Sequence, residues 1–302
     1  MAGNSTRAVL VALGANFAIA VAKGVAAYFT KSGAMLAETV HSLADCGNQL
    51  LLLLGMKQSK QPPSPEHPLG RGKEIYFWSF LVAVILFVVG GIYSLYEGWH
   101  KLQHPEPLRD WWWAVGVLSF AIIAEGYSTH ACLKEAAKDR NGRSLWRWFR
   151  ESREAALIVI VGENIAALLG LVVALIAVVA SVLTGNPLWD AIGTLAIGVL
   201  LVVIAVFVAI EVKAMLVGQG IDPRRQQEMR VFLDARPEIA GVISLLTLQL
   251  GDEALVSLQV AMHEGTELHG VARAIDAVEQ ALKARFPEVR WTFVEPDLKP
   301  EL

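Results

Sequence analysis

The stretch Ala37-Glu-Thr-Val-His-Ser-Leu-Ala-Asp45 lies inside an apolar run and carries His41 and Asp45. Residues four apart on a helix share one face, so the imidazole and the carboxylate would lie one turn apart. An ionisable pair at bilayer depth is costly and usually marks a functional site. Imidazole nitrogen and carboxylate oxygen are also suitable ligands for zinc and its first-row neighbours. The stretch therefore predicts half of a metal site inside a membrane helix.

The rest of the chain divides into an apolar part and a soluble part. Of its 302 residues, 54% are hydrophobic and only 18% are charged. The apolar runs stop near residue 213, so we expect a transmembrane domain over residues 1–213 and a small soluble domain over residues 214–302. About 20 apolar residues are needed for a helix to cross the hydrocarbon core. The sequence predicts six such spans, at about residues 9–29, 34–54, 78–96, 112–133, 155–183 and 188–210.

Lysine and arginine are distributed unevenly among the connecting loops. Residues 57–73 and 134–153 together carry eleven of them, and the opposite loops carry three. Because cytosolic loops are enriched in these residues, both termini are expected in the cytosol. The first apolar run is too long for a cleavable signal peptide and contains Asn16 and Lys23. The pattern is typical of a multi-pass membrane protein, of the cell membrane if the source is prokaryotic.

The soluble part predicts the order α-β-β-α-β. Asp222 and Pro223 suit the N-cap and first position of a helix that runs to about Ala235. Residues 242–250 and 254–262 alternate apolar and polar side chains, and Gly251-Asp252 between them indicates a hairpin. Residues 266–285 follow as an amphipathic helix and 289–294 as a short strand. We expect a small open sheet with helices on one face, whose edge or other face could pair with a second copy.

Polar residues form a stripe along the second predicted span. They lie three or four positions apart, at Glu38, His41, Asp45 and Asn48. The fifth span carries Glu163 and Asn164. At ~1.5 Å per residue, Asp45 and Asn164 both come near the bilayer midplane, where they can meet. Four polar groups in one stripe within lipid favour a functional site over a structural hydrogen bond.

Other polar residues fit structural roles as well. Glu125 in the fourth span suits either a metal site or a protonated carboxyl between helices. Asn164 alone is more typical of an interhelical hydrogen bond than of a ligand. In the soluble part, surface positions are favoured over a regulatory metal site for His263, Glu264, Glu267 and His269.

Several functions are disfavoured by the absence of their motifs. No basic, aromatic-interleaved surface indicates nucleic-acid binding. No phosphate-binding G-x-x-x-x-G-K-[ST] motif indicates an ATPase, and no His-Glu-x-x-His motif indicates a metalloprotease. Cys46 and Cys132 fall within predicted spans, so no structural disulfide is expected. Together with the family resemblance given next, these absences favour a secondary transporter over an enzyme.

Several sequence blocks, in order, resemble the cation diffusion facilitators, or solute carrier family 30, and are most similar to its zinc transporter 9-like branch. The resemblance covers nearly the whole chain. The blocks are His41-Ser-Leu-Ala-Asp45 with Gly47-Asn48-Gln49, Glu66-His-Pro-Leu-Gly-Arg-Gly-Lys-Glu74, Tyr76-Phe-Trp-Ser-Phe80, Gly90-Gly91 and Tyr96-Glu-Gly98.

The resemblance implies a homodimer that exports Zn²⁺ or a related divalent ion in exchange for protons. It also implies a ferredoxin-like cytosolic domain and a transport site between the second and fifth spans. On the fifth span the family's aspartate position falls on Asn164 and its histidine position on Ile160. The implied ligand set is oxygen-rich: His41, Asp45, Asn164 and Glu163, with Glu125 and Glu38 as weaker candidates.

Metal binding and proton binding would compete at such a site, because ligation requires a neutral imidazole and an ionised carboxylate. We therefore predict proton-coupled antiport by alternating access. The alternative is a transport-compromised family member that acts as a membrane metal sensor or scaffold, which the amide at Asn164 favours and the intact His41/Asp45 pair opposes. The identity of the ion, the proton stoichiometry and metal binding by the soluble domain stay open at this stage.

Overall fold

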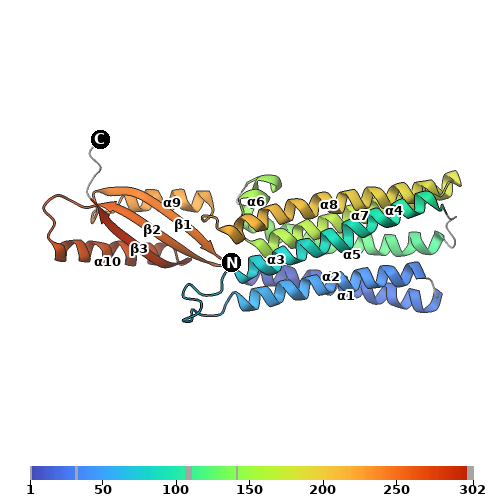
Figure 1. Ribbon diagram of the computed structural model, residues 1–302, viewed down its shortest axis with the longest axis horizontal. Helices are drawn as coiled ribbons and strands as arrows, with labels where there is room; N and C mark the ends of the chain where they lie inside the picture. Colours follow the sequence, from blue (N-terminus) through green and yellow to red (C-terminus); the bar gives the residue numbers. More distant parts are fainter. Residues whose placement is uncertain (1, 31–32, 106–110, 141, 298–302) are drawn as a thin grey trace.

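A computed structural model describes residues 2–30, 33–105, 111–140 and 142–297. In this part of the chain, long helices run side by side and form a helical domain, with the sheet domain at one end (Figure 1). One of the long helices is continuous from residue 74 to 103 through a π-helical segment, η1. The helical domain comprises α1 (Ala2–Thr30), α2 (Gly33–Gln58), α3 (Glu74–Ile85), η1 (Leu86–Ile92), α4 (Tyr93–Gln103), α5 (Trp111–Arg140), α6 (Leu145–Glu151), α7 (Ala155–Thr184) and α8 (Leu188–Val217).

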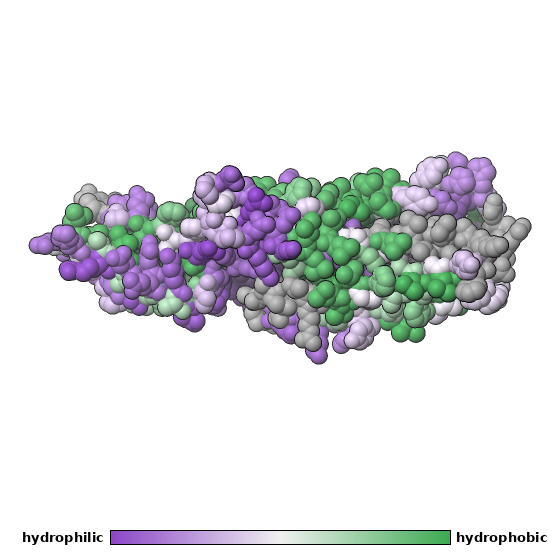
Figure 2. Space-filling model, turned by 90° about the horizontal axis from the view of Figure 1, so that it is seen from below, coloured by the Kyte–Doolittle hydropathy of each residue, from purple (hydrophilic) through white to green (hydrophobic). Residues whose placement is uncertain are grey.

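Three helices of the described residues are long and apolar enough to cross a membrane: Glu74–Gln103, Ala155–Thr184 and Leu188–Val217. Helix α1 contains a shorter apolar segment, Val9–Ala22. Helices α2 and α5 occupy the second and fourth predicted spans. Both helices are continuous, but polar residues interrupt their apolar sequence. Some helices are longer than the predicted spans because turns with charged residues are also helical. Helix α5, for example, continues past residue 133 to Arg140. Hydrophobic residues gather over the helical domain and hydrophilic residues over the sheet domain (Figure 2). Six crossings stay a prediction.

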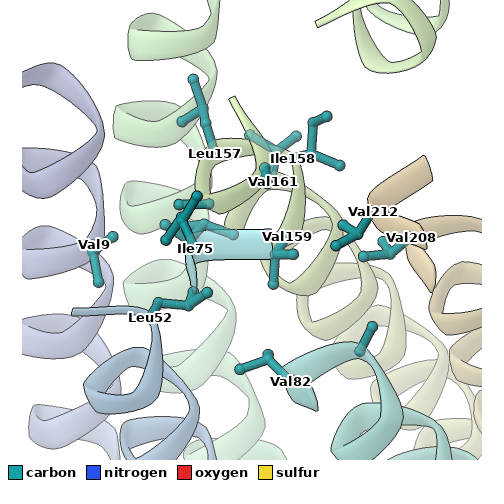
Figure 3. Close-up of a cluster of buried hydrophobic side chains, with 14 of the residues drawn as sticks. Val9, Leu52, Ile75, Val82, Leu157, Ile158, Val159, Val161, Val208 and Val212 are labelled. Carbon is teal, nitrogen blue, oxygen red and sulfur yellow. The ribbon is translucent and has the colours of Figure 1, made fainter. Parts of the chain in front are cut away.

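Helix α7 lies at the centre of the helical domain. Every residue from Ala155 to Asn164 is buried, so this half of the helix has neighbours on all sides. Its apolar side chains pack against Val9 of α1, Leu52 of α2, and residues of α3 and α8 (Figure 3). Within a membrane such packing is stabilised by van der Waals contacts between the helices and not by removal of apolar surface from water. Any polar residue in this half of α7 is therefore held away from water and must find its partners in other helices.

Glycines allow α4 and α8 to approach closely. A Cβ at Gly98 would lie 2.8 Å from the backbone nitrogen of Leu195, and one at Gly198 would lie 2.8 Å from that of Leu95. Small residues of this kind support helix packing within membranes. The block Tyr96-Glu-Gly98 thus has a packing role on the side of the helical domain away from α2.

The sheet domain has the predicted order α-β-β-α-β. Strands β1 and β2 are antiparallel and joined at Gly251-Asp252, and β3 pairs parallel with β2. Alternate residues of β2 point toward α9 and α10, which share one hydrophobic core on the same face of the sheet. Asp222 accepts a hydrogen bond from the backbone N–H of Arg224, as its predicted N-cap role requires. The elements are α9 (Pro223–Asp234), β1 (Gly241–Leu250), β2 (Glu253–Ala261), α10 (Leu268–Arg285) and β3 (Val289–Asp297).

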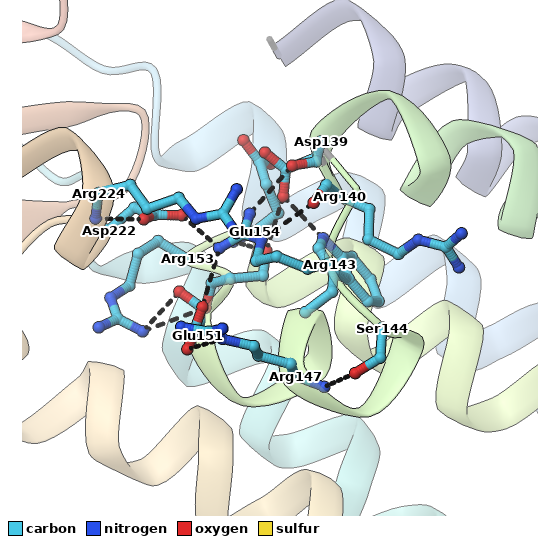
Figure 4. Close-up of polar contacts among 12 residues, drawn as sticks. Asp139, Arg140, Arg143, Ser144, Arg147, Glu151, Arg153, Glu154, Asp222 and Arg224 are labelled. Carbon is cyan, nitrogen blue, oxygen red and sulfur yellow. Dashed lines mark hydrogen bonds and ion pairs between the residues drawn. The ribbon is translucent and has the colours of Figure 1, made fainter.

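An ionic network joins the two domains around α6, a helix that the sequence analysis did not predict (Figure 4). Arg143 is buried, and its guanidinium lies 2.6 Å from Asp222 and 3.4 Å from Glu151. Arg153 donates a hydrogen bond of 2.8 Å to the carbonyl of Gly220. A further contact links the hydroxyl oxygen of Tyr76 to the backbone N–H of Gly251 at 2.9 Å. The sheet domain is thus tied to three separate segments of the helical domain.

Candidate metal centre

Glu163 lies in the buried half of α7 and faces α2. Its side chain is only 4% exposed. The amide nitrogen of Asn48 donates a hydrogen bond of 3.1 Å to its Oε1. Oε2 finds no hydrogen-bond partner within the described part of the chain. Glu163 therefore brings a carboxylate to the predicted second-span stripe and keeps one oxygen available for another ligand.

Asn164 follows Glu163 directly but its amide nitrogen turns to α5. Consecutive helical residues point about 100° apart, so the two side chains meet different neighbours. Its Nδ2 atom donates to the hydroxyl of Ser128 at 2.9 Å and to the sulfur of Cys132 at 3.2 Å. The hydroxyl of Thr129 donates to its backbone carbonyl at 3.4 Å. Asn164 thus links α5 to α7, the structural role that the sequence analysis had weighed against ligation.

Asp45 completes the described part of the stripe on α2. It is half-buried and lies one turn before Asn48. Its carboxylate, and that of Glu125 on α5, lie close enough to Glu163 for electrostatic interaction. Glu125 is itself buried. The buried Glu125 and the half-buried Asp45 thus lie within electrostatic range of the buried Glu163, which is unfavourable unless positive charge or hydrogen bonds compensate.

The side chains of His41 and Glu38 lie outside the part that the structure describes. Their positions on α2 follow from the helix itself, since His41 precedes Asp45 by four residues. Among the side chains described, no three histidine, cysteine, aspartate or glutamate residues form a group suited to hold a metal. In the same described set, His263 and His269 form no such group either. Cys46 and Cys132 are both free thiols and are both buried, in agreement with the expected absence of a disulfide.

A second pair of amides extends the polar layer from α2 to α1. The amide nitrogen of Asn16 donates to Oε1 of Gln49 at 3.1 Å, and both side chains are buried. The sequence analysis noted each residue but assigned neither to the site. The available signal was that each is a polar residue within a predicted membrane span, where polar groups need partners. This layer fixes the rotation of α2, and with it the direction in which Asp45 and Asn48 point.

The chain matches known proteins over most of its length. Residues 9–217 match the family model for the cation efflux transmembrane domain. Over 247 residues the chain is 32% identical to the proton-coupled zinc antiporter SLC30A9, mitochondrial, of Mus musculus and of Homo sapiens, which covers 81% of this chain and 44% of each relative. This chain thus spans less than half the length of those relatives.

Two further relatives come from a plant and a bacterium. Metal tolerance protein C4 of Arabidopsis thaliana is 30% identical over 232 residues, 76% of this chain and 51% of the relative. Cation-efflux pump FieF of Klebsiella pneumoniae (strain 342) is 26% identical over 293 residues, 93% of this chain and 89% of the relative. Similarity to the bacterial pump therefore extends through both domains.

Proposed function

The chain belongs to the cation efflux family, and we propose that it exports a divalent metal cation of the zinc type across a membrane. The observation that carries this proposal is that the carboxylates of Asp45 on α2 and Glu163 on α7 lie within electrostatic range of each other, inside the region that matches the family. A divalent cation between the half-buried carboxylate of Asp45 and the buried carboxylate of Glu163 would offset their repulsion, and carboxylate oxygens ligate zinc. The relatives, which include zinc antiporters and a cation-efflux pump, support the same class of cargo.

We assign the ligands to His41, Asp45 and Glu163. His41 would complete the set from the turn of α2 before Asp45. Glu163 replaces Asn164 as the principal α7 ligand in this assignment. The amide nitrogen of Asn164 donates a hydrogen bond to Ser128 on α5, which turns that side chain toward α5. An amide is in any case a poor zinc ligand. Asn164, Glu125 and Glu38 then stay weaker candidates for the ligand set.

Antiport with protons follows from the chemistry of this ligand set. Metal binding requires neutral imidazole and ionised carboxylates, so loading releases protons and protonation releases metal. We propose that the chain has six membrane spans with both termini in the cytosol. Rocking of these helices around the central site would expose it alternately to each side of the membrane. In this scheme the gradient of protons drives export, and no nucleotide is consumed.

A homodimer is proposed from the uncovered face of the sheet. Helices α9 and α10 cover only the opposite face. On the uncovered face, Leu246 of β1 and Phe293 of β3 are 59% and 56% exposed. They flank Ser257 of β2, which pairs with both in the register of the sheet. A contiguous exposed apolar face of this kind marks an interaction site, and a second copy supplies a complementary one.

Flux into proteoliposomes tests the transport proposal. Purified protein is reconstituted with a fluorescent pH indicator inside, and zinc, manganese, cobalt, iron, cadmium and magnesium are offered in turn under imposed pH gradients. Asp45→Asn should abolish flux of the preferred metal and its coupled proton movement. Asp190→Asn is the matched control, because Asp190 also lies in the helical domain but pairs with Lys101 at 2.9 Å.

The outcomes separate transport from the sensor alternative. Flux that depends on Asp45 and on the pH gradient supports proton-coupled export. Saturable metal binding without flux, in wild type and Asp190→Asn alike, would support the sensor or scaffold function instead. Equal flux in wild type and Asp45→Asn would contradict the assigned site.

A further inference from the structure

A groove of about 610 Å³ lies where the two domains meet, outside the candidate metal centre. Its walls come from the loop between α2 and α3, the start of α3 and the end of β1. In Figure 1 this loop reaches from the helical domain to the near end of the sheet. The volume falls in the range of small-molecule sites. The groove lies apart from the metal centre, and its Leu248 lies on the same face of β1 as Leu246, beside the proposed dimer face.

Basic residues form part of the lining of the groove. His67, Arg71 and Lys73 line it, and Glu74 is its one acidic residue. Arg71 lies 4.0 Å from Glu74, at the limit of an ion pair. Lys73 forms no ion pair with any carboxylate in the described part of the structure. The groove therefore has an excess of positive charge available to an anion.

Apolar residues form another part of the lining. Phe77 of α3 contributes a ring that is 49% exposed, and Leu69, Leu248 and Leu250 add aliphatic surface. Lys73 precedes and Phe77 follows Glu74, where one of the three helices long and apolar enough to cross a membrane begins. This is the height at which lipid headgroups meet acyl chains. A ligand for this groove needs an anionic head and an apolar body at that level.

We propose that the groove binds an anionic phospholipid, with its phosphate at Arg71 and Lys73 and an acyl chain along Phe77. The charge of the rim and the apolar wall match the two halves of such a molecule, and free phosphate would use only the first. Leu248 and Leu250 belong to the sheet domain, so the bound lipid contacts both domains. Lipid binding therefore stabilises the junction. The inference rests on the membrane placement of the helical domain and not on metal transport.

The full-length protein in detergent tests the proposal by native mass spectrometry and thermal unfolding. Phosphatidylglycerol should be retained and should raise Tm more than phosphatidylcholine with identical acyl chains. The double variant Arg71→Gln/Lys73→Gln should bind phosphatidylglycerol about 30-fold more weakly, because each cation near a surface contributes about fivefold. The charge-preserving variant Arg71→Lys/Lys73→Arg should keep binding. The matched control, Lys134→Gln/Lys213→Gln, removes two cations outside the groove and should also keep it.

Three results would overturn the proposal. Equal retention of the two lipids would show that the headgroup charge is not recognised. An equal Tm rise with glycerol phosphate alone would assign the groove to soluble phosphates. Undiminished phosphatidylglycerol binding in the charge-removing variant would place the lipid elsewhere. If that variant does not fold, loss of binding in the charge-preserving variant decides against the proposal. None of these measurements of lipid retention and Tm depends on metal flux. Failure of the transport proposal can therefore be told apart from failure of the lipid-binding proposal.

Discussion

Asp222 has two separable roles, one on each carboxylate oxygen. Its Oδ1 accepts the hydrogen bond from the Arg224 backbone N–H that caps α9, at 2.9 Å. Its Oδ2 accepts from the guanidinium of Arg143 at 2.6 Å, across the junction between the domains. Asn caps helices as well as Asp does. Asp222→Asn therefore keeps the cap and removes the ion pair, whereas Asp222→Ala removes both.

The stability lost when this ion pair is removed depends on how far Arg143 and Asp222 are exposed to solvent. The Arg143 side chain is 1% exposed and that of Asp222 is 25% exposed. Exposed ion pairs contribute ~0–1 kcal/mol, and breaking a fully buried one costs ~3–5 kcal/mol. Burial by itself lowers the pKa of Arg143, but Asp222 and Glu151 raise that pKa above its usual range, so the arginine stays charged. We expect Asp222→Asn to cost about 2 kcal/mol and Asp222→Ala about 3 kcal/mol, since a lost cap adds ~1 kcal/mol.

Thermal unfolding of the full-length protein, followed by tryptophan fluorescence, measures both changes at one scan rate. At roughly 2 °C per kcal/mol for a large chain, Tm should fall by about 4 °C in Asp222→Asn and about 6 °C in Asp222→Ala. The Tm of the double variant Arg143→Met/Asp222→Asn should fall by less than the sum of the Tm decreases in the two single variants. A wild-type Tm for Asp222→Asn, or strict additivity in the double variant, would refute the reasoning.

The remaining predictions concern pH and packing at the same junction. The hydrogen bond from Arg147 lowers the pKa of Glu151. The stability it confers is therefore present above the unfolded pKa of about 4.3 and is lost as pH falls through the lower folded value. Melting curves at pH 6, 4.5 and 3.5 should show the Tm deficit of Glu151→Gln narrowing on acidification, and a constant deficit would contradict this. In Gly72→Ala the new methyl would overlap the carbonyl oxygen of Leu250, and such overpacking costs ~1–3 kcal/mol. Gly241→Ala is its control, because a Cβ there meets nothing within 4 Å; equal Tm values for these two variants would show that the contact adapts.

Features governed by neighbouring residues were predictable from the sequence. Apolar runs of sufficient length gave the positions of the long helices, because helix formation and burial depend on local periodicity. The Asp222-Pro223 pair located the start of α9, and Gly251-Asp252 located the hairpin, where Gly251 has φ of 68°. The sequence blocks also identified the family that the comparisons show. The short helix α6 was missed, although Ser144 caps it by accepting from the backbone N–H of Arg147.

Which helix each polar side chain faces was decided only by the tertiary structure. Periodicity places Glu163 and Asn164 on α7 but does not say which neighbour lies on each side. The packing of α2 and α5 around α7 directs Glu163 toward Asn48 and turns the Asn164 amide nitrogen to Ser128. The groove at the domain junction likewise depends on residues far apart in the chain. Sequence pattern thus sets which groups are carried into the membrane domain, whereas long-range packing sets which of them meet, because that depends on helix rotations fixed by contacts between distant segments.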